Sequence, residues 1–183
     1  MVRFADSSRE WGAVTRLLHW TLAPAILLML GSGLWMARLE YTHPLYLTLP
    51  AFHKSLGTLL APLLLVHLLW RGANRRPAAA LGAWERLLSR LVQSLLLWLP
   101  ILMVISGYLL VTAHGRPLTL WGGWEIPPPP GLDRLQEPAG AVHQALGWTL
   151  GGLLLLHLLG VLKHVWIDRD DLLARIWFGG ERR

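Results

Sequence analysis

The sequence predicts an all-α integral membrane protein, a four-helix bundle with both termini in the cytoplasm. Three observations support this fold class. Of the 183 residues, 54% are apolar and only 15% are charged, and the mean hydropathy is +0.42. The apolar residues form blocks of about twenty, the length that a helix needs to cross about 30 Å of hydrocarbon. The 17 Lys and Arg residues lie mainly beside these blocks, as is typical of membrane spans.

Four apolar segments define one transmembrane domain over residues 1–183. The predicted spans run over about 17–37, 52–70, 87–112 and 141–162. The loop before the last span contains four consecutive prolines, Pro127 to Pro130, and should be irregular because proline cannot continue a helix. The first span follows several arginines, as in a signal peptide, but it has full span length and lacks a clear small-x-small cleavage site. We therefore expect it to be retained.

The distribution of positive charge predicts the orientation. Thirteen Lys and Arg residues precede the first span, follow the fourth or lie between the second and third, against four on the opposite side. Because positive segments stay in the cytoplasm, both termini are predicted to be cytoplasmic in a bacterial inner membrane. The same distribution indicates membrane lipid, and not nucleic acid, as the partner of this basic chain. The thirteen are Arg3, Arg9, Arg16, Arg71, Arg75, Arg76, Arg86, Arg90, Lys163, Arg169, Arg175, Arg182 and Arg183, and the four are Arg38, Lys54, Arg116 and Arg134.

The absence of cysteine restricts the cofactors that the chain can bind. Without thiols, it can form no disulfide, no thiolate metal site, no iron–sulfur cluster and no covalent attachment of c-type haem. A redox cofactor would have to be held by other side chains.

Five histidines fall within the predicted spans, where an ionisable residue is costly enough to mark a functional site. They are His19 in the first span, His53 and His67 in the second, and His143 and His157 in the fourth. In both the second and the fourth span the two histidines are 14 residues apart. This spacing returns to nearly the same helix face after about 21 Å of rise, so each helix presents one histidine near each membrane surface.

Depth along the spans predicts how these histidines pair. His53 and His143 each open a span that runs inward, so both lie near the outer surface. His157 lies near the inner surface, where His19 and His67 are both candidate partners, and spacing alone does not choose between them. A haem with two axial histidines takes one from each of two helices at the same level, so the pattern predicts two b-type haems stacked across the membrane.

A purely structural role, or a zinc site, fits the five histidines less well. A single intramembrane histidine is often an interhelical hydrogen bonder, but four at matched depths on three helices are harder to explain in that way. Zinc is disfavoured because no Asp or Glu lies within a predicted span. The remaining histidines, His43, His114 and His164, are predicted to lie outside the spans.

Two arginines are candidate partners for the propionates of the inner haem. Arg16 lies one turn before His19, and Arg71 lies four residues after His67. A guanidinium group pairs strongly with a carboxylate. Near the outer surface, Gly57 and Gly147 each follow a histidine by four residues, which suits either the close approach of a haem or ordinary helix packing.

The sequence around these histidines resembles the bacterial cytochrome b561 family, small di-haem proteins related to the haem subunits of nickel–iron hydrogenases and formate dehydrogenases. The resemblance covers nearly the whole chain. Its motifs are Arg16-Leu17-Leu18-His19-Trp20, Gly33-Leu34-Trp35-Met36, His53-Lys54-Ser55-Leu56-Gly57, Ile105-Ser106-Gly107-Tyr108, Gly115-Arg116-Pro117, and Lys163-His164 followed by Asp168-Arg169-Asp170-Asp171.

The resemblance implies a specific set of ligands for two haem b groups. It pairs His19 with His157 at the inner level and His53 with His143 at the outer level. His67 stands where such proteins usually have arginine, so we interpret it as a residue near an inner-haem propionate and keep ligation as its alternative.

The resemblance also implies electron transfer with ubiquinone. Iron with two histidine ligands has no open position for oxygen, which suits outer-sphere electron transfer. The first function expected is that of a self-contained oxidoreductase that passes electrons from a small periplasmic donor to ubiquinone. Some relatives are proposed to oxidise superoxide, and Lys54 and Arg116 are the cations available near the outer haem for such an anion.

Two other functions compete with this one. The chain could be a relay subunit between the quinone pool and a separate periplasmic redox partner, although relatives of that kind usually carry extra length for docking. It could also be a transporter or a structural membrane protein without a cofactor.

Overall fold

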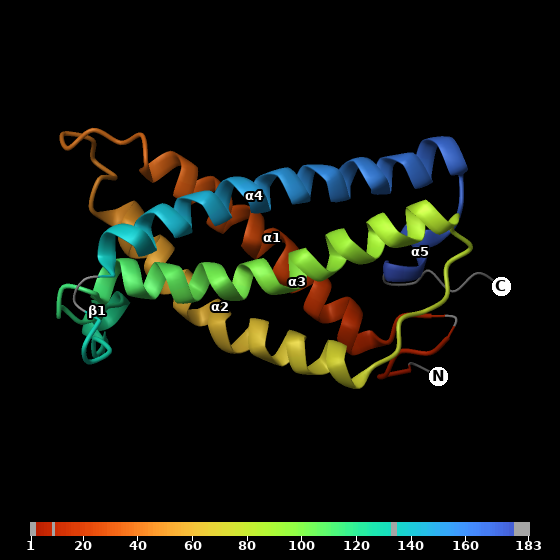
Figure 1. Ribbon diagram of the computed structural model, residues 1–183, viewed down its shortest axis with the longest axis horizontal. Helices are drawn as coiled ribbons and strands as arrows, with labels where there is room; N and C mark the ends of the chain where they lie inside the picture. The colour runs from red at the N-terminus through yellow and green to blue at the C-terminus, as the bar shows by residue number, and fades with distance from the viewer. Residues whose placement is uncertain (1–2, 9, 133–134, 178–183) are drawn as a thin grey trace.

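Four long helices lie side by side along the molecule (Figure 1). The computed structural model describes residues 3–8, 10–132 and 135–177. The long helices are α1 (Ala13–Met36), α2 (Thr48–Ala73), α3 (Ala83–Thr112) and α4 (Gln136–Lys163). The shorter elements are β1 (Leu118–Thr119), η1 (Trp121–Gly123), β2 (Glu125–Ile126), η2 (His164–Asp168) and α5 (Leu172–Ile176). All four long helices have the length and hydropathy to cross a membrane, which confirms the predicted helical membrane bundle.

Prolines lie inside three of the long helices and in the loop between α3 and α4. Pro24, Pro62 and Pro100 lie inside α1, α2 and α3. Transmembrane helices tolerate such residues because neighbouring helices and side chains satisfy the freed backbone groups. The segment from Pro127 to Pro130 is non-helical, as predicted, and follows the antiparallel pair β1 and β2.

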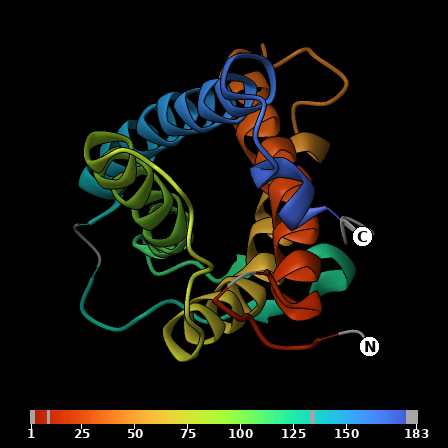
Figure 2. The same ribbon diagram turned by 90° about the vertical axis from the view of Figure 1, so that its right-hand side faces the viewer.

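The helices form a ring in the order α1, α2, α3, α4 when the bundle is viewed along its length (Figure 2). Contacts are most extensive between α3 and α4 and between α1 and α2, so the bundle consists of two closely packed helical hairpins. Helices α2 and α4 come from different hairpins and face each other across the ring. Between the two ends, Leu22 of α1 packs against Leu60 and Leu64 of α2 in a buried apolar cluster.

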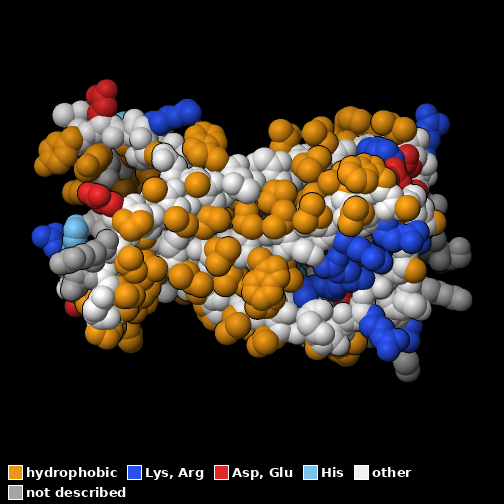
Figure 3. All heavy atoms as spheres, in the orientation of Figure 1, with side chains coloured by type: hydrophobic (Ala, Val, Ile, Leu, Met, Phe, Trp, Pro, Cys, Tyr) orange, Lys and Arg blue, Asp and Glu red, His pale blue; other side chains and the backbone are white. Residues whose placement is uncertain are grey.

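The outside of the bundle is apolar over its middle (Figure 3). Large side chains such as Leu28, Leu59, Trp98 and Leu155 are exposed on the four helices. In water this surface would be unfavourable, but lipid tails are as apolar as leucine. The exterior is therefore the surface expected of a protein in a bilayer.

Both the start of α1 and the end of the described chain lie at the same end of the bundle (Figure 1). We call this end the basic end. We call the opposite end the hairpin end, after the antiparallel β-hairpin that β1 and β2 form there. At the basic end the Trp20 indole N–H donates to the Ile176 carbonyl at 2.9 Å. The Lys163 ammonium pairs with the Glu85 carboxylate at 2.6 Å. These contacts join the tail to α1 and the end of α4 to the start of α3.

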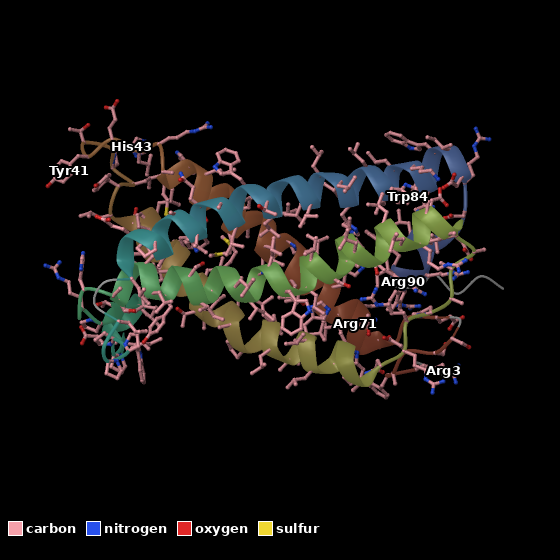
Figure 4. All side chains as sticks on the ribbon, in the orientation of Figure 1. Arg3, Tyr41, His43, Arg71, Trp84 and Arg90 are labelled. Carbon is pink, nitrogen blue, oxygen red and sulfur yellow. The ribbon has the colours of Figure 1, made fainter. Side chains whose placement is uncertain are left out.

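The basic residues divide between the two ends as the orientation argument requires. Figure 3 shows Lys and Arg gathered toward the basic end, and Figure 4 labels Arg3, Arg71 and Arg90 there. By their places in the chain, the described members of the larger group are Arg3, Arg16, Arg71, Arg75, Arg76, Arg86, Arg90, Lys163, Arg169 and Arg175. The described residues of the opposite group are Arg38, Lys54 and Arg116. Arg9, Arg134, Arg182 and Arg183 lie outside the described residues.

Reporter fusions test the orientation. A fluorescent protein that folds only in the cytoplasm is expected to fluoresce when fused after Arg183, because positive charge at the basic end opposes translocation. Alkaline phosphatase, which is active only in the periplasm, should be inactive at the same position. As the control, both reporters are inserted between Gly122 and Gly123 at the hairpin end, where the activities should be reversed. Phosphatase activity at the C-terminal fusion would contradict the prediction.

Candidate functional site

At the hairpin end, His53 of α2 faces His143 of α4 across the ring of helices. The centroids of the two imidazole rings are 6.4 Å apart, and the ring planes are inclined by 81°. His53 is buried and His143 is half-buried. The structure thus brings together the two residues that the sequence pairs by depth.

The spacing of these rings suits two ligands of one metal ion. A histidine nitrogen binds a metal at about 2 Å, and the ring centre lies about 1 Å behind that nitrogen, so imidazoles on opposite sides of one iron have centres about 6 Å apart. The observed 6.4 Å between the centroids agrees with this value. The two side chains therefore fit a haem with two axial histidines.

The Nδ1 atom of each hairpin-end histidine is held by a serine from the preceding helix. Ser32 Oγ of α1 lies 2.9 Å from His53 Nδ1, and Ser106 Oγ of α3 lies 3.1 Å from His143 Nδ1. The Met103 carbonyl oxygen also lies 3.1 Å from His143 Nδ1. Because a carbonyl oxygen only accepts, this Nδ1 carries the proton, which leaves the lone pair of Nε2 for a metal.

Sequence reasoning missed the role of both serines, although a repeated pattern marks them. Residues 29–33 and 103–107 share the arrangement Met-x-x-Ser-Gly, once in α1 and once in α3. In each copy the serine hydroxyl donates to the methionine carbonyl three residues earlier, at 3.1 Å. The pattern could have been found by aligning the first predicted span with the third.

The glycine that ends each copy makes room for the histidine ring. A Cβ atom at Gly33 would lie 3.2 Å from His53 Cε1, and one at Gly107 would lie 3.0 Å from His143 Cε1. Carbon atoms that are not bonded normally stay farther apart. Glycine therefore allows the ring of one helix to lie directly against the backbone of its neighbour.

The two glycines singled out in the sequence pack against methionines. A Cβ atom at Gly57 would lie 3.1 Å from Met29 Cε, and one at Gly147 would lie 3.9 Å from Met103 Cε. The structure therefore supports close helix packing as the role of these glycines.

At the basic end, three histidines from three helices form a second group. His19 of α1 lies within electrostatic range of both His157 of α4 and His67 of α2. All three are half-buried. In the part of the chain that the structure describes, no group forms a hydrogen bond with any of these rings. The structure therefore brings together the same three residues that spacing leaves as candidates.

Arg16 supports the idea of an acidic group bound near His19. Its Nε atom is buried and lacks a hydrogen-bond partner among residues 3–8, 10–132 and 135–177. A buried donor without an acceptor is costly. Since Arg16 lies one turn before His19, a haem propionate at the basic end would supply the missing acceptor.

Arg71 has a partner within the protein. Its Nη1 atom lies 2.9 Å from the Asp6 carboxylate, and these side chains are only 10% and 0% exposed. The guanidinium group also lies over the Trp11 ring, 5.0 Å from its centroid. Arg71 therefore anchors the segment before α1, and Arg16 is the stronger candidate for a propionate.

Lys54, next to His53, lines an open pocket of about 450 Å³ at the hairpin end. The pocket lies between the end of α1 and the start of α2. Its other lining residues are Met36, Ala37, Tyr46, Leu47 and Pro50. The lining is thus mainly apolar with one cationic side chain. Arg116, the other cation expected there, is exposed in the loop after α3.

Potential metal ligands also meet beyond α4. Atoms of His164, Asp168 and Asp170 lie within 4.8 Å of one another. However, Asp168 also pairs with Lys163 at 2.6 Å, and His164 lies 2.8 Å from Asp170. We therefore interpret these residues as an exposed ion-pair network that stabilises η2.

Four apolar membrane helices that bring histidines together toward both ends of the bundle are the arrangement of a membrane cytochrome of the b type. The sequence profile described as Prokaryotic cytochrome b561 matches residues 10–179, and the chain belongs to this family. It is 34% identical over 176 residues to Cytochrome b561 homolog 2 of Escherichia coli (strain K12), and the match covers 94% of each chain. The resemblance seen in the sequence is thus confirmed. The protein is a multi-pass bacterial membrane protein of a family that binds haem b and transfers electrons.

Adding a methyl group at Gly107 is expected to displace His143. The new Cβ atom would lie 3.0 Å from the ring, so Gly107→Ala should lose up to about half of the bound haem through overpacking. Gly33→Ala, with a 3.2 Å contact to His53, should lose less. Haem per chain is measured in detergent by the pyridine haemochrome assay.

Gly31→Ala is the matched control because, apart from its chain neighbours and the nearby backbone of its own helix, no described heavy atom lies within 4 Å of a Cβ at that position. It makes the same substitution in α1, two residues before Gly33, and should retain all the haem. Equal haem content in the three variants would contradict the importance of the close contacts.

Proposed function

We propose that this chain binds two haem b groups and transfers electrons between them across the inner membrane. His53 and His143 hold one haem at the hairpin end, and His19 and His157 hold the other at the basic end. The observation that carries the proposal is the His53–His143 pair, whose rings are 6.4 Å apart. At the basic end, family resemblance favours His19 over His67 as the partner of His157.

The side chains around the haems would orient the ligands and keep water out. Haem supplies a one-electron couple at its iron, and two histidine ligands leave no position for oxygen. Ser32 and Ser106 fix the rings of the hairpin-end histidines by hydrogen bonds to Nδ1. The apolar cluster around Leu22 and Leu60 lies between the two levels and excludes water there.

At the basic end, the unpaired Nε of Arg16 would hold one propionate. A charge-assisted hydrogen bond to this atom would offset the cost of burying the carboxylate. His67 lies within electrostatic range of His19 and would lie near the same haem. This assignment keeps His67 outside the ligand set.

The direction of transfer in the proposal is from the periplasm to ubiquinone. The basic end would face the cytoplasm, and the hairpin end would receive electrons from a small periplasmic donor. Lys54, the residue after His53, supports this direction of transfer. It lines an open pocket, where its ammonium group would attract an anion such as superoxide.

A relay to a separate periplasmic redox protein is the second candidate. The observation in its favour is a group of exposed aromatic side chains at the hairpin end, where Tyr41 is 82% exposed and Trp124 is 77% exposed. Aromatic residues are enriched in protein interfaces, although they also suit the membrane surface.

Purified protein tests the two functions. A reduced-minus-oxidised spectrum should show b-type haem at two per chain. Superoxide as the sole donor should then reduce added ubiquinone rapidly, and Lys54→Gln should slow this reaction while leaving the haem content unchanged. Haem without superoxide-dependent quinone reduction, together with a stable complex with a periplasmic redox protein, would favour the relay. A chain without haem would contradict both.

Single substitutions test the ligands of the basic-end haem. His19→Ala is expected to lose about half of the haem because it removes one of two axial ligands, and His157→Ala should do the same. His67→Ala should retain both haems. The absorption spectrum and the haem-to-protein ratio are measured for each variant. Retention of both haems in His19→Ala with loss in His67→Ala would instead assign His67 as the ligand.

A further inference from the structure

Two buried serines contact the hairpin-end histidines at the ring atom that faces away from a haem iron. Ser32 is 9% exposed and Ser106 is 6% exposed. Their hydroxyl oxygens lie 2.9 Å from His53 Nδ1 and 3.1 Å from His143 Nδ1. Each serine comes from a different helix than its histidine, so both contacts are interhelical.

The direction of these hydrogen bonds follows from the second partner of each hydroxyl. The Ser32 hydroxyl donates to the Met29 carbonyl, and the Ser106 hydroxyl donates to the Met103 carbonyl, both at 3.1 Å. Each proton is thus committed to a carbonyl, and the oxygen lone pairs remain for the histidine. The histidine Nδ1–H groups are therefore the donors, and each bond continues from imidazole through hydroxyl to carbonyl. Such chains of hydrogen bonds polarise and strengthen one another.

We propose that Ser32 and Ser106 are positioning residues that lower the midpoint potential of the hairpin-end haem. An acceptor at Nδ1–H increases the electron density on Nε2, which makes imidazole a stronger donor to iron. A stronger donor stabilises the ferric state over the ferrous state, and the potential falls. This inference rests on the proposed ligation of that haem by His53 and His143.

Among residues 3–8, 10–132 and 135–177, nothing equivalent to these serine contacts occurs at the basic end. No described residue forms a hydrogen bond with the rings of His19, His67 or His157. This difference places the hairpin-end haem at the lower potential. Electron transfer from the hairpin end to the basic end is then downhill.

The two serine hydroxyls differ in whether another described group could accept the hydrogen bond in their place. His143 Nδ1 has a second acceptor, the Met103 carbonyl, at 3.1 Å. Among the described residues, His53 Nδ1 has Ser32 alone. Removing the Ser32 hydroxyl therefore leaves a buried donor without an acceptor, whereas removing that of Ser106 leaves a carbonyl in place.

Redox titration of the detergent-purified holoprotein tests the proposal. Haem content is measured first, and the spectral component that disappears in His53→Ala identifies the hairpin-end haem. Ser32→Ala should raise the midpoint potential of that haem, Ser106→Ala should raise it by a smaller amount, and neither should change the other haem. Ser32→Thr, which keeps a hydroxyl, should restore the potential.

Ser55→Ala is the matched control. Ser55 is a buried serine of α2 at the same level, and its hydroxyl oxygen accepts a hydrogen bond from the Trp121 backbone N–H at 3.1 Å. Among the described residues, it forms no hydrogen bond with a histidine. The potential of both haems should stay unchanged in this variant. A shift equal to that of Ser32→Ala would show a general packing effect and would overturn the proposal.

The remaining outcomes separate this inference from the proposed function. An unchanged potential in Ser32→Ala with both haems bound overturns the role of the serines and leaves the ligand assignment intact. If Ser32→Ala binds only one haem, Ser106→Ala decides, because a rise supports the inference and an unchanged potential overturns it. Retention of both haems in His53→Ala would contradict the ligand assignment itself.

Discussion

A histidine in hydrocarbon needs a partner for each ring nitrogen, and the architecture of this protein follows from that constraint. Water cannot satisfy either nitrogen inside a bilayer, and an unpaired polar group there costs free energy. At the hairpin end, Nδ1 of His53 and Nδ1 of His143 each form a hydrogen bond with a serine from the adjacent helix. The other nitrogen of each ring is left for a metal. The contacts between α1 and α2 and between α3 and α4 are arranged so that serine and histidine meet.

The two ends of the bundle meet this constraint differently. The hairpin end uses neutral hydrogen bonds within each of two closely packed pairs of helices, α1 with α2 and α3 with α4. The basic end instead combines three histidines with Arg16, whose buried Nε has no described partner. At the hairpin end the described polar contacts are thus largely complete. At the basic end, Arg16 Nε lacks a described acceptor, which an acidic ligand would supply. Haem b, which proteins of this family bind, would account for both arrangements if it were held at each end as proposed.

Sequence reasoning predicted the spans and the pairing of His53 with His143 because these depend on periodicity and depth, whereas the same arguments left His19 and His67 open as partners of His157. Hydropathy locates α1 to α4, and equal spacing aligns His53 with His143. Hydropathy and spacing do not fix the rotation of each helix about its axis. The hydrogen bonds that Ser32 and Ser106 accept from the histidines were therefore found only in the structure. The ion pair between Arg71 and Asp6 was missed for a related reason. It depends on the N-terminal segment folding back to a residue 65 positions away.

The Met-x-x-Ser-Gly pattern has a consequence for assembly. Each copy lies in the same helical hairpin as the histidine that it holds, so α1–α2 and α3–α4 can each orient a ligand before the other is present. Contacts between the hairpins are sparser than contacts within them. A haem bound as proposed, by one histidine from each hairpin, would therefore join the two hairpins to each other. Bound in this way, haem would complete the tertiary structure of the protein as well as supply its redox chemistry.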